Sequence, residues 1–359
     1  MSGLHIGGRF IAYQDLADYS SVAEHGHATD AIDFCKSYLS NAASYQLATS
    51  GSTGTSKNIT LSRKQLQASA RMTIEALALK THYRALLCIS TAHIGGIMML
   101  VRGMELNMEV FLIDPPSKLN TKDLPAIDFV ALVPLQLKQL IGSNSGRQFL
   151  EDCKVIILGG AKIDPVLEEQ LEQIHTPIYH SFGMTETASH FALRKLTNPN
   201  KQKNYHILPG IQIDTDQRGC LVVNGEITNN IPLTTNDLIK TVDSNSFIWL
   251  GRWDRVINTG GFKVNPESIE PLIANVFKEA DITSDFAVVG LPHPKWGEQV
   301  TLVIEGMADK AVLCNLLEGI QNNIHPYEMP KEIRSLNSLP KTRSGKIDYP
   351  RLVQILTKE

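Results

Sequence analysis

Short apolar segments alternate with amphipathic helix patterns through the middle of the chain, and this alternation limits the available folds more than any other feature. The apolar segments are rich in β-branched and bulky residues and occupy 84–90, 109–114, 128–133, 154–159 and 177–182. Helix-period patterns at 134–142 and 164–174 lie between several of them. Elements in this order predict parallel strands covered by helices, which is an α/β fold.

Two further stretches predict how this part of the chain is built. Ser62 and Gln65 match a capping box, and the apolar spacing that follows predicts a helix over 62–79. The uncharged run 85–101 contains a histidine, hydroxyl residues and two glycines, and it is slightly short for a bilayer span. We therefore expect a buried strand, a loop at Thr91–His93 and the start of a core helix, with no membrane insertion.

The pattern changes after about residue 205, where shorter β-like pieces with turn residues begin. Asn265 followed by Pro266 predicts a further helix start, because Asn caps helices and Pro suits the first helical position. A chain of 359 residues also exceeds the usual size of a single core. We therefore expect a large layered α/β domain over 1–253 and a small α+β domain over 254–359.

The composition argues against several classes of protein. A net charge of −3 with 43% hydrophobic residues offers no electrostatic footprint for nucleic acid or an anionic membrane. The five cysteines are scattered, which favours a reducing compartment over a disulfide framework or a zinc site. The N-terminal residues lack a signal-peptide pattern. A cytoplasmic protein is expected, and a homo-oligomer is compatible with these properties.

The segment TSGSTGTSK (49–57) combines hydroxyl side chains, glycines and one lysine, as phosphate-binding loops do. A Walker loop needs glycine and lysine side by side before a helix, whereas Ser56 precedes Lys57 and the following NITLS has a strand pattern. Taken alone, such a segment is also typical of a surface turn. Its candidate phosphate-binding residues are Thr49, Ser50, Gly51, Ser52, Thr53, Gly54, Thr55 and Lys57.

Four more motifs follow this loop in order: SFGMTETAS (181–189), TTNDL (234–238), GRWDRVIN (251–258) and PKTRSGK (340–346). Together the five resemble the motifs of the adenylate-forming superfamily of acyl-CoA synthetases, luciferases and peptide-synthetase adenylation domains. Three residues depart from that pattern: Ser56 replaces a proline, Asn236 a glycine and Asn258 a lysine. The resemblance covers nearly the whole chain and implies the adenylate-forming fold, shortened at the N-terminus.

The resemblance implies a two-step ligase. A carboxylic acid attacks the α-phosphorus of MgATP, and a thiol, normally coenzyme A, then displaces AMP. Because the acid and ATP are both anions, the first step needs positive charge and directed N–H groups. The resemblance implies that the 49–57 loop binds the departing phosphates, that Thr185 binds an α-phosphate oxygen and that Glu186 binds Mg²⁺. It also implies that Lys346 bridges the acid and the phosphate.

The resemblance also implies how the remaining groups bind. Asp237 and Arg252 are expected at the ribose. Phe182 is expected to stack on adenine, and its motif includes Ser181 and Gly183. The turn Gly159-Gly160-Ala161 is expected along another edge of the base. Asp254 occupies the family's hinge position. Gly260 and Gly261 are expected to leave a channel for the pantetheine of coenzyme A in the second step.

The identity of the acid is constrained by residues 90–106. An amino acid is disfavoured, because no carboxylate stands at Thr91–His93 to pair its ammonium. His93-Ile-Gly-Gly followed by Arg102 resembles the o-succinylbenzoate–CoA ligases, whose substrate has a second carboxylate. Candidates to bind that carboxylate are His93, Ser189, His190 and Arg194, whereas His25 and His27 are expected in a surface loop. A ligase for another aryl or fatty acid, or a nucleotide-binding regulator without activity, remains an alternative.

Overall fold

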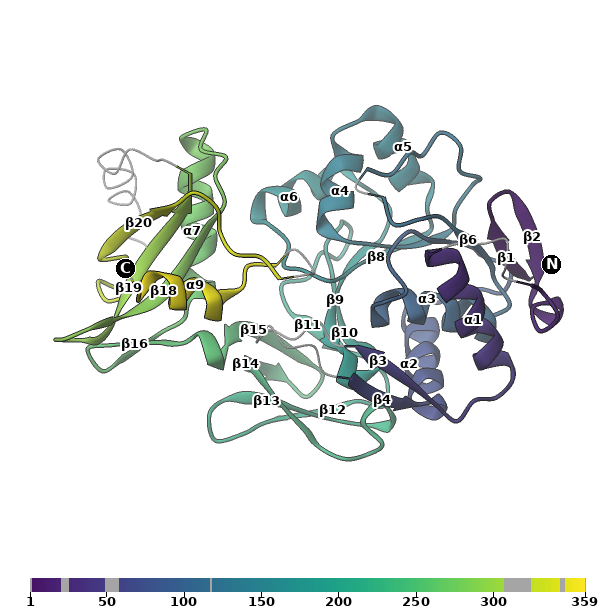
Figure 1. The fold of residues 1–359 in the computed structure, drawn as a ribbon, viewed down its shortest axis with the longest axis horizontal. Coiled ribbons are helices and arrows are strands. Elements are labelled where there is room, and N and C mark those ends of the chain that lie inside the picture. The colour runs from purple at the N-terminus through teal and green to yellow at the C-terminus, as the bar shows by residue number, and fades with distance from the viewer. Residues whose placement is uncertain are drawn as a thin grey trace.

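The structure is a computed structural model that describes residues 2–20, 26–48, 58–116, 118–306, 324–342 and 346–358. These residues form two lobes of unequal size (Figure 1). The short helix η6 (Trp253–Arg255) links the last strand of the large lobe's sheet to the first strand of the small lobe's sheet. No helix within the described ranges is long and apolar enough to cross a bilayer.

The large lobe is built on one sheet of thirteen strands, in the order β12-β13-β14-β15-β11-β10-β9-β8-β7-β5-β6-β1-β2. Its strands are β1 (Gly3–Ile6), β2 (Arg9–Ala12), β5 (Arg84–Leu87), β6 (Glu109–Leu112), β7 (Phe129–Leu132), β8 (Val155–Leu158), β9 (Ile178–Met184), β10 (Ser189–Lys195), β11 (Tyr205–Ile207), β12 (Gln212–Thr215), β13 (Cys220–Asn224), β14 (Leu233–Asp243) and β15 (Ser246–Arg252). A separate hairpin pairs β3 (Ser44–Ala48) with β4 (Asn58–Ser62).

Pairing within the large sheet changes from parallel to antiparallel at β9. The run β1-β6-β5-β7-β8-β9 is parallel, as the alternating pattern predicts, and β10 continues it antiparallel. All four residues of β7 and all four of β8 are buried, because helices cover both faces of a parallel sheet. The predicted α/β class of this lobe is therefore confirmed.

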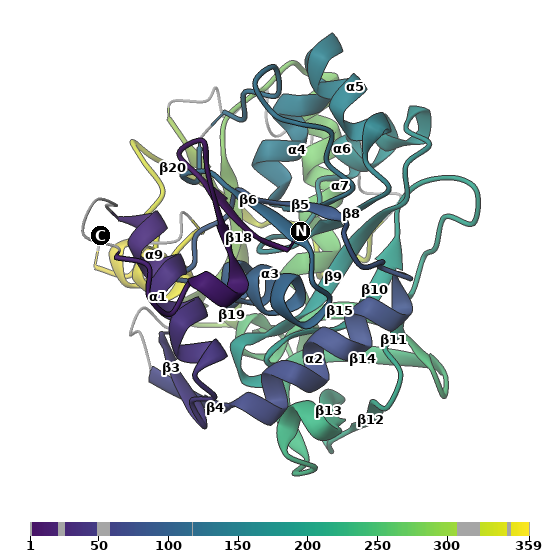
Figure 2. The ribbon, with the colours of Figure 1, turned by 90° about the vertical axis from the view of Figure 1, so that its right-hand side faces the viewer.

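Helices lie on both faces of the parallel strands (Figure 2). One layer packs in the core cluster that contains Leu87, and the other packs in the cluster that contains Leu86, so neighbouring residues of β5 point to opposite faces. The first layer is α1 (His27–Leu39), α2 (Arg63–Ala76) and α3 (Ile94–Glu105), and the second is α4 (Pro134–Ile141), α5 (Asn144–Asp152) and α6 (Pro165–Gln170). The remaining short helices of this lobe are η1 (Tyr13–Asp15), η3 (Leu171–Gln173), η4 (Thr185–Thr187) and η5 (Glu226–Thr228).

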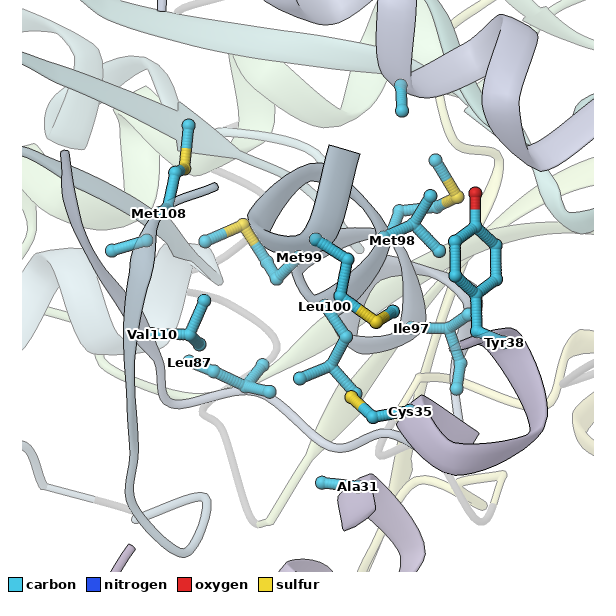
Figure 3. Close-up of a cluster of buried hydrophobic side chains, with 14 of the residues drawn as sticks. Ala31, Cys35, Tyr38, Leu87, Ile97, Met98, Met99, Leu100, Met108 and Val110 are labelled. Atoms are coloured by element: carbon cyan, nitrogen blue, oxygen red, sulfur yellow. The ribbon is translucent and has the colours of Figure 1, made fainter. Parts of the chain in front are cut away.

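The uncharged run 85–101 folds as expected into a strand, a loop and a buried helix. Figure 3 shows side chains of α3 between those of α1 and the neighbouring strands, including Cys35, Tyr38, Leu87, Ile97, Met98, Met99, Leu100 and Val110. Flexible methionines suit such an irregular gap. At the far end of α3, the Tyr38 hydroxyl donates to Glu105 at 2.7 Å.

The small lobe is the expected α+β unit. Its sheet has the order β17-β16-β19-β18, and β20 pairs parallel with β19. The elements are β16 (Ile257–Thr259), β17 (Phe262–Val264), α7 (Pro266–Glu279), β18 (Phe286–His293), β19 (Gly297–Glu305), β20 (Glu332–Leu336) and α9 (Tyr349–Leu356).

Two sequence signals for helix starts have different outcomes. Ser62 caps α2 in the predicted box: its hydroxyl accepts from the Gln65 amide, and the Gln65 side chain accepts from the Ser62 amide. Helix α2 ends at Ala76, earlier than predicted, because Ala78 takes a left-handed backbone conformation with φ 48°. Asn265 precedes α7 as predicted, but its side chain donates to the Leu250 carbonyl of β15 instead of capping the helix.

We expect Ser62→Ala to lower the free energy of unfolding by about 1 kcal/mol, because the Gln65 amide at the start of α2 loses its acceptor. Urea unfolding followed by circular dichroism measures this change as a lower midpoint. Ser244→Ala, at an exposed turn position between β14 and β15, is the matched control. Equal midpoints for the two variants would contradict a stabilising role for the box.

Candidate active site

The motif residues of the large lobe gather at the edge where the parallel strands end. The turn Gly159-Gly160-Ala161 follows β8, and Thr185 and Glu186 follow β9. Because β8 and β9 are parallel neighbours, both segments leave the sheet at the same edge. The loop at Thr91–His93, which follows β5, belongs to the same edge. Ligands of open α/β sheets bind at such an edge.

The 159–161 turn needs its glycines for two separate reasons. Gly160 has φ +85°, which only glycine adopts readily, and a Cβ on Gly159 would lie 2.9 Å from the Ser181 hydroxyl. That hydroxyl donates to the Leu158 carbonyl at 2.8 Å. The His180 Nε2 lies 3.0 Å from the Ala161 carbonyl and donates to it. Neighbouring strand residues thus hold the turn in one conformation, with its backbone available for close approach by a ligand.

Thr185 and Glu186 form the tight turn between β9 and β10. The Thr187 hydroxyl holds this turn: it lies 3.0 Å from the Met184 carbonyl and 2.7 Å from the Ser189 carbonyl. Ala188 and Ser189 have φ values of 51° and 108°, a conformation that costs free energy and is concentrated at functional sites. Glu186 is half-buried and has neither a hydrogen bond nor an ion pair among the described residues. One carboxylate in this state suits Mg²⁺, which takes most of its other ligands from phosphate and water.

Gly183 is required by the close approach of β9 to β10. A Cβ at this position would collide with backbone atoms of Ser189 and His190. Phe182, one residue earlier, lies in an aromatic group with ring-centroid distances of 5.7 Å to Phe191 and 5.3 Å to Phe247. The Phe182 side chain is half-buried, so only part of its ring remains for a stacking ligand.

Asp237 and Arg252 face each other across the β14–β15 pair, as the two motifs require. Asp237 is buried and accepts a hydrogen bond from the Trp249 indole at 2.9 Å. Burial raises the pKa of Asp237, although Trp249 and Arg252 act in the opposite direction. Only one of its two oxygens is used by Trp249, so the other is available for a hydroxyl donor.

Arg252 is bound more closely to Asp254 than to Asp237. Its guanidinium donates to both oxygens of Asp254 at 2.8 and 2.7 Å and lies 4.0 Å from the nearer oxygen of Asp237. Burial raises the pKa of Asp254, but the hydrogen bonds and charge of Arg252 outweigh it and hold that pKa below its ordinary value. Asp254, expected at the hinge, is therefore ion-paired to Arg252, which is expected at the ribose.

The segment before α9, which carries Lys346, extends from the small lobe toward the large one (Figure 1). Lys346 is exposed, but the surrounding protein, and to a smaller extent the positive charge of Arg252, lower its pKa. The expected role of Lys346 between the acid and the phosphate stays a prediction.

The departures from the family motifs have local partners. Asn236, in place of glycine, accepts from the Arg218 guanidinium at 3.2 Å. The backbone amide of Asn258 donates to Glu298 at 2.7 Å, and Asn258 is the exposed residue of strand β16. The third departure, Ser56, lies outside the described residues.

The other predicted site residues are distributed as follows. Gly260 and Gly261 form the turn between β16 and β17 of the small lobe, with φ values of 56° and 86°, beside the exposed ring of Phe262. His93 is exposed at the start of α3. The glycine–hydroxyl loop, with Thr49, Ser50, Gly51, Ser52, Thr53, Gly54, Thr55 and Lys57, lies outside the described residues; the strands that flank it, β3 and β4, pair with each other.

Two predictions are wrong, one for Arg194 and one for His27. Arg194 is already neutralised by Glu168, to which it donates at 3.0 and 2.8 Å, so it is not a free carboxylate ligand. His27 is not in a surface loop: it begins α1 and is half-buried, and its Nδ1 lies 3.1 Å from the Thr91 hydroxyl. Burial lowers the pKa of His27, so a neutral ring is favoured. His25 lies outside the described residues.

Arg102 is a candidate functional residue that the sequence prediction did not include among its site residues. It lies on α3 with 2% of its surface exposed, and its Nε and Nη2 have no hydrogen-bond partner among the described residues. Burial lowers the pKa of Arg102 to about 9, so the guanidinium is still charged at neutral pH. The sequence signal was one arginine among the apolar residues and glycines of 94–104.

Comparison with known proteins agrees with this geometry. The AMP-binding enzyme family matches residues 24–228, and the family of AMP-binding enzyme C-terminal domains matches residues 273–346. The solved acyl-CoA synthetase (AMP-forming)/AMP-acid ligase II-like protein of Dyadobacter fermentans is 38% identical, with a TM-score of 0.64 over 96% of this chain and 99% of that one.

Two further relatives carry a more specific name. A 2-succinylbenzoate–CoA ligase of Staphylococcus epidermidis is 27% identical over 83% of this chain and 67% of its own length. The O-succinylbenzoate coenzyme A synthetase of Bacillus subtilis, solved with ATP and magnesium, shares the fold at 20% identity and a TM-score of 0.72, over 86% of this chain and 69% of that one. The chain thus spans about two thirds of the length of these relatives.

The chain belongs to the AMP-binding enzyme family, the adenylate-forming acyl-CoA ligases. The resemblance seen in its motifs and the predicted fold class are both confirmed.

We expect Asp237→Asn to weaken ATP binding about 10- to 100-fold, because a hydrogen bond to a charged acceptor is lost while the buried position tolerates a neutral amide. Isothermal titration calorimetry with ATP measures this change. Asp243→Asn, near the other end of β14, is the control because Asp243 is exposed. Equal affinities of both variants and the unaltered protein would contradict the assignment of Asp237 to the ribose.

Proposed function

We propose that this protein is an ATP-dependent acid–CoA ligase that forms an acyl-AMP and then an acyl-CoA, with 2-succinylbenzoate as the acid. Membership of the AMP-forming ligases supports the reaction class, and the names of the Staphylococcus and Bacillus relatives support the substrate. The observation that carries the substrate is the buried, unpaired guanidinium of Arg102.

In the first step a carboxylate oxygen of the acid bonds to the α-phosphorus of ATP, and pyrophosphate leaves with the electrons of the broken P–O bond. In this proposal Lys346 and Arg252 offset the charge of the two anions as they meet. In the second step the sulfur of coenzyme A bonds to the acyl carbon, AMP leaves, and the thiol proton is released.

The other residues of the edge have binding roles in this proposal. Thr185 donates to an α-phosphate oxygen, and Glu186 holds Mg²⁺, which neutralises phosphate charge when it is bound. Asp237 accepts from the ribose hydroxyls, with Arg252 nearby, and the 159–161 turn and Phe182 border adenine beside Ser181 and Gly183. The 49–57 loop takes the outer phosphates. Gly260 and Gly261 admit the pantetheine.

Arg102 is assigned to the second carboxylate of the substrate. A buried cation without a partner destabilises a fold, and an anionic ligand would relieve that cost. His190 lies close enough for the charge of Arg102 to affect it, and it directly follows Ser189 after the Thr185–Glu186 turn. Helix α3 contacts β10, so a carboxylate at Arg102 would lie near the β10 residues that follow the Thr185–Glu186 turn.

His190 contributes a neutral group to this region. Its Nε2 lies 3.0 Å from the Thr73 hydroxyl, and that hydroxyl donates to the Ser69 carbonyl at 3.0 Å, so Nε2 carries the proton. Burial, with a smaller contribution from Arg102, lowers the pKa of His190 well below its ordinary value. A neutral His190 leaves Arg102 as the buried positive charge for the carboxylate, while Ser189 and His93 remain candidates for further contacts.

A cytoplasmic location is part of the proposal. The cysteines in the described part of the chain (Cys35, Cys88, Cys153 and Cys220) are all free and buried, as in a reducing compartment.

Lys346→Ala is expected to slow acid-dependent pyrophosphate release about 10²- to 10³-fold, because a charge that acts in the transition state of adenylation is lost. The same variant should convert chemically prepared acyl-AMP to the thioester at close to the normal rate. Both half-reactions are measured separately by chromatography. A similar loss in both would contradict the assigned role, and ATP binding without turnover of any acid would indicate a regulator.

Arg102→Met is expected to raise the KM for 2-succinylbenzoate about 10- to 100-fold, because a desolvated charge pair loses one partner. The variant should be at least as thermostable as the unaltered protein, since an unpaired buried charge is removed. Arg71→Met, at an exposed position of α2, is the control. An unchanged KM, or stronger activity of the unaltered protein with benzoate or a fatty acid, would contradict the substrate.

A further inference from the structure

A cluster of charged side chains joins the two lobes next to the 159–161 turn. Lys162 follows that turn directly and belongs to the large lobe, whereas Glu267 and Glu270 lie on α7 of the small lobe. Lys162 Nζ lies 3.4 Å from Glu270 and 4.6 Å from the centre of the Trp249 ring on β15. Helices α6 and α7 face each other at this point (Figure 1).

The rest of the cluster lies within the small lobe and its connection to the large one. Arg255 donates to Glu267 at 2.9 Å and to Glu270 at 2.5 Å, and its guanidinium lies 3.6 Å from the centre of the Tyr349 ring. The Tyr349 hydroxyl lies 3.5 Å from Glu270. Glu270 therefore accepts from both lobes, while Arg255 holds it in place.

Charge balance in this cluster depends on how the lobes are oriented. With Lys162 present, two cations face two carboxylates. If the small lobe rotates away, Lys162 stays with the large lobe and Arg255 alone faces Glu267 and Glu270. The Glu267 side chain is only 2% exposed, and its Oε2 has no hydrogen-bond partner among the described residues. Loss of a nearby cation is therefore costly for this carboxylate.

In the same orientation the segment before α9, which carries Lys346, extends toward the large lobe (Figure 1). The Lys162 side chain is connected through the backbone to Ala161, whose carbonyl accepts from His180 of β9. The residue that would contact a ligand at the 159–161 turn, Ala161, is thus followed directly by the residue that contacts the small lobe, Lys162.

We propose that Lys162 is a positioning residue: the Trp249 ring of the large lobe orients its side chain, and its ion pair with Glu270 holds the small lobe in the orientation that presents Lys346 for adenylation. The inference rests on the proposed ligase function, because it assigns Lys162 to one of the two half-reactions. The Lys162 side chain is 48% exposed, so the ion pair is screened by water and its effect is a modest shift between orientations.

Lys162→Met removes the charge and keeps most of the apolar stem. Pyrophosphate release should fall about two- to fivefold, the upper range for one half-exposed ion pair acting on a conformational equilibrium. Thioester formation from prepared acyl-AMP should be unchanged or faster, and Lys162→Arg should restore adenylation. A merely structural role would lower both half-reactions together, and that result would overturn the proposal.

Lys278→Met is the matched control, because Lys278 forms a second contact between the lobes, 3.4 Å from Glu169, with both side chains largely exposed. It should behave like the unaltered protein. Small-angle X-ray scattering with AMP provides a readout that does not depend on the acid: Lys162→Met should depart from the profile of the structure described above, and Lys278→Met should match it. Unchanged scattering of Lys162→Met would overturn the proposal, whereas absence of turnover with every acid would contradict only the ligase function.

Discussion

The parallel pairing of β8 with β9 determines where the candidate site can form. Leu158 lies opposite His180 in this pair, so both strands end at the same edge of the sheet. The 159–161 turn and the Thr185–Glu186 turn leave from that edge. Beyond β9 the sheet continues antiparallel to β14 and β15, which carry Asp237 and Arg252. Backbone hydrogen bonds of one continuous sheet therefore bring together residues that are far apart in the sequence.

The site and its surroundings contain charges that are costly without a ligand. Glu186 has no partner among the described residues, and Asp237 is buried with a raised pKa. Arg102 adds a buried guanidinium with unpaired N–H groups in the part of the chain that the structure describes. Such arrangements reduce stability and are typical of binding sites, where the ligand supplies the missing charge. Together they favour a ligand that combines phosphates, a metal ion and more than one carboxylate.

Local signals in the sequence were reliable where one element decides the outcome. The capping box at Ser62 formed because both partners lie within one helical turn, and the 85–101 run folded as a strand, a loop and a buried helix. Predictions failed where a distant partner competes. Glu168 on α6 neutralises Arg194 on β10, Thr91 binds His27, and the carbonyl of Leu250 takes the Asn265 side chain. None of these partners can be read from residue spacing.

The sequence by itself determined the order of strands and helices, the family and the identity of the motif residues, because each depends on short-range patterns or on residue types in a fixed order. Only the tertiary structure decided which charges are buried and which meet across the lobes. Arg102 became a candidate because α3 is covered on all sides, and Lys162 because α7 brings Glu270 to it. Desolvation and charge pairing depend on distances between remote elements, and these distances exist only once the sheet and the two lobes have assembled.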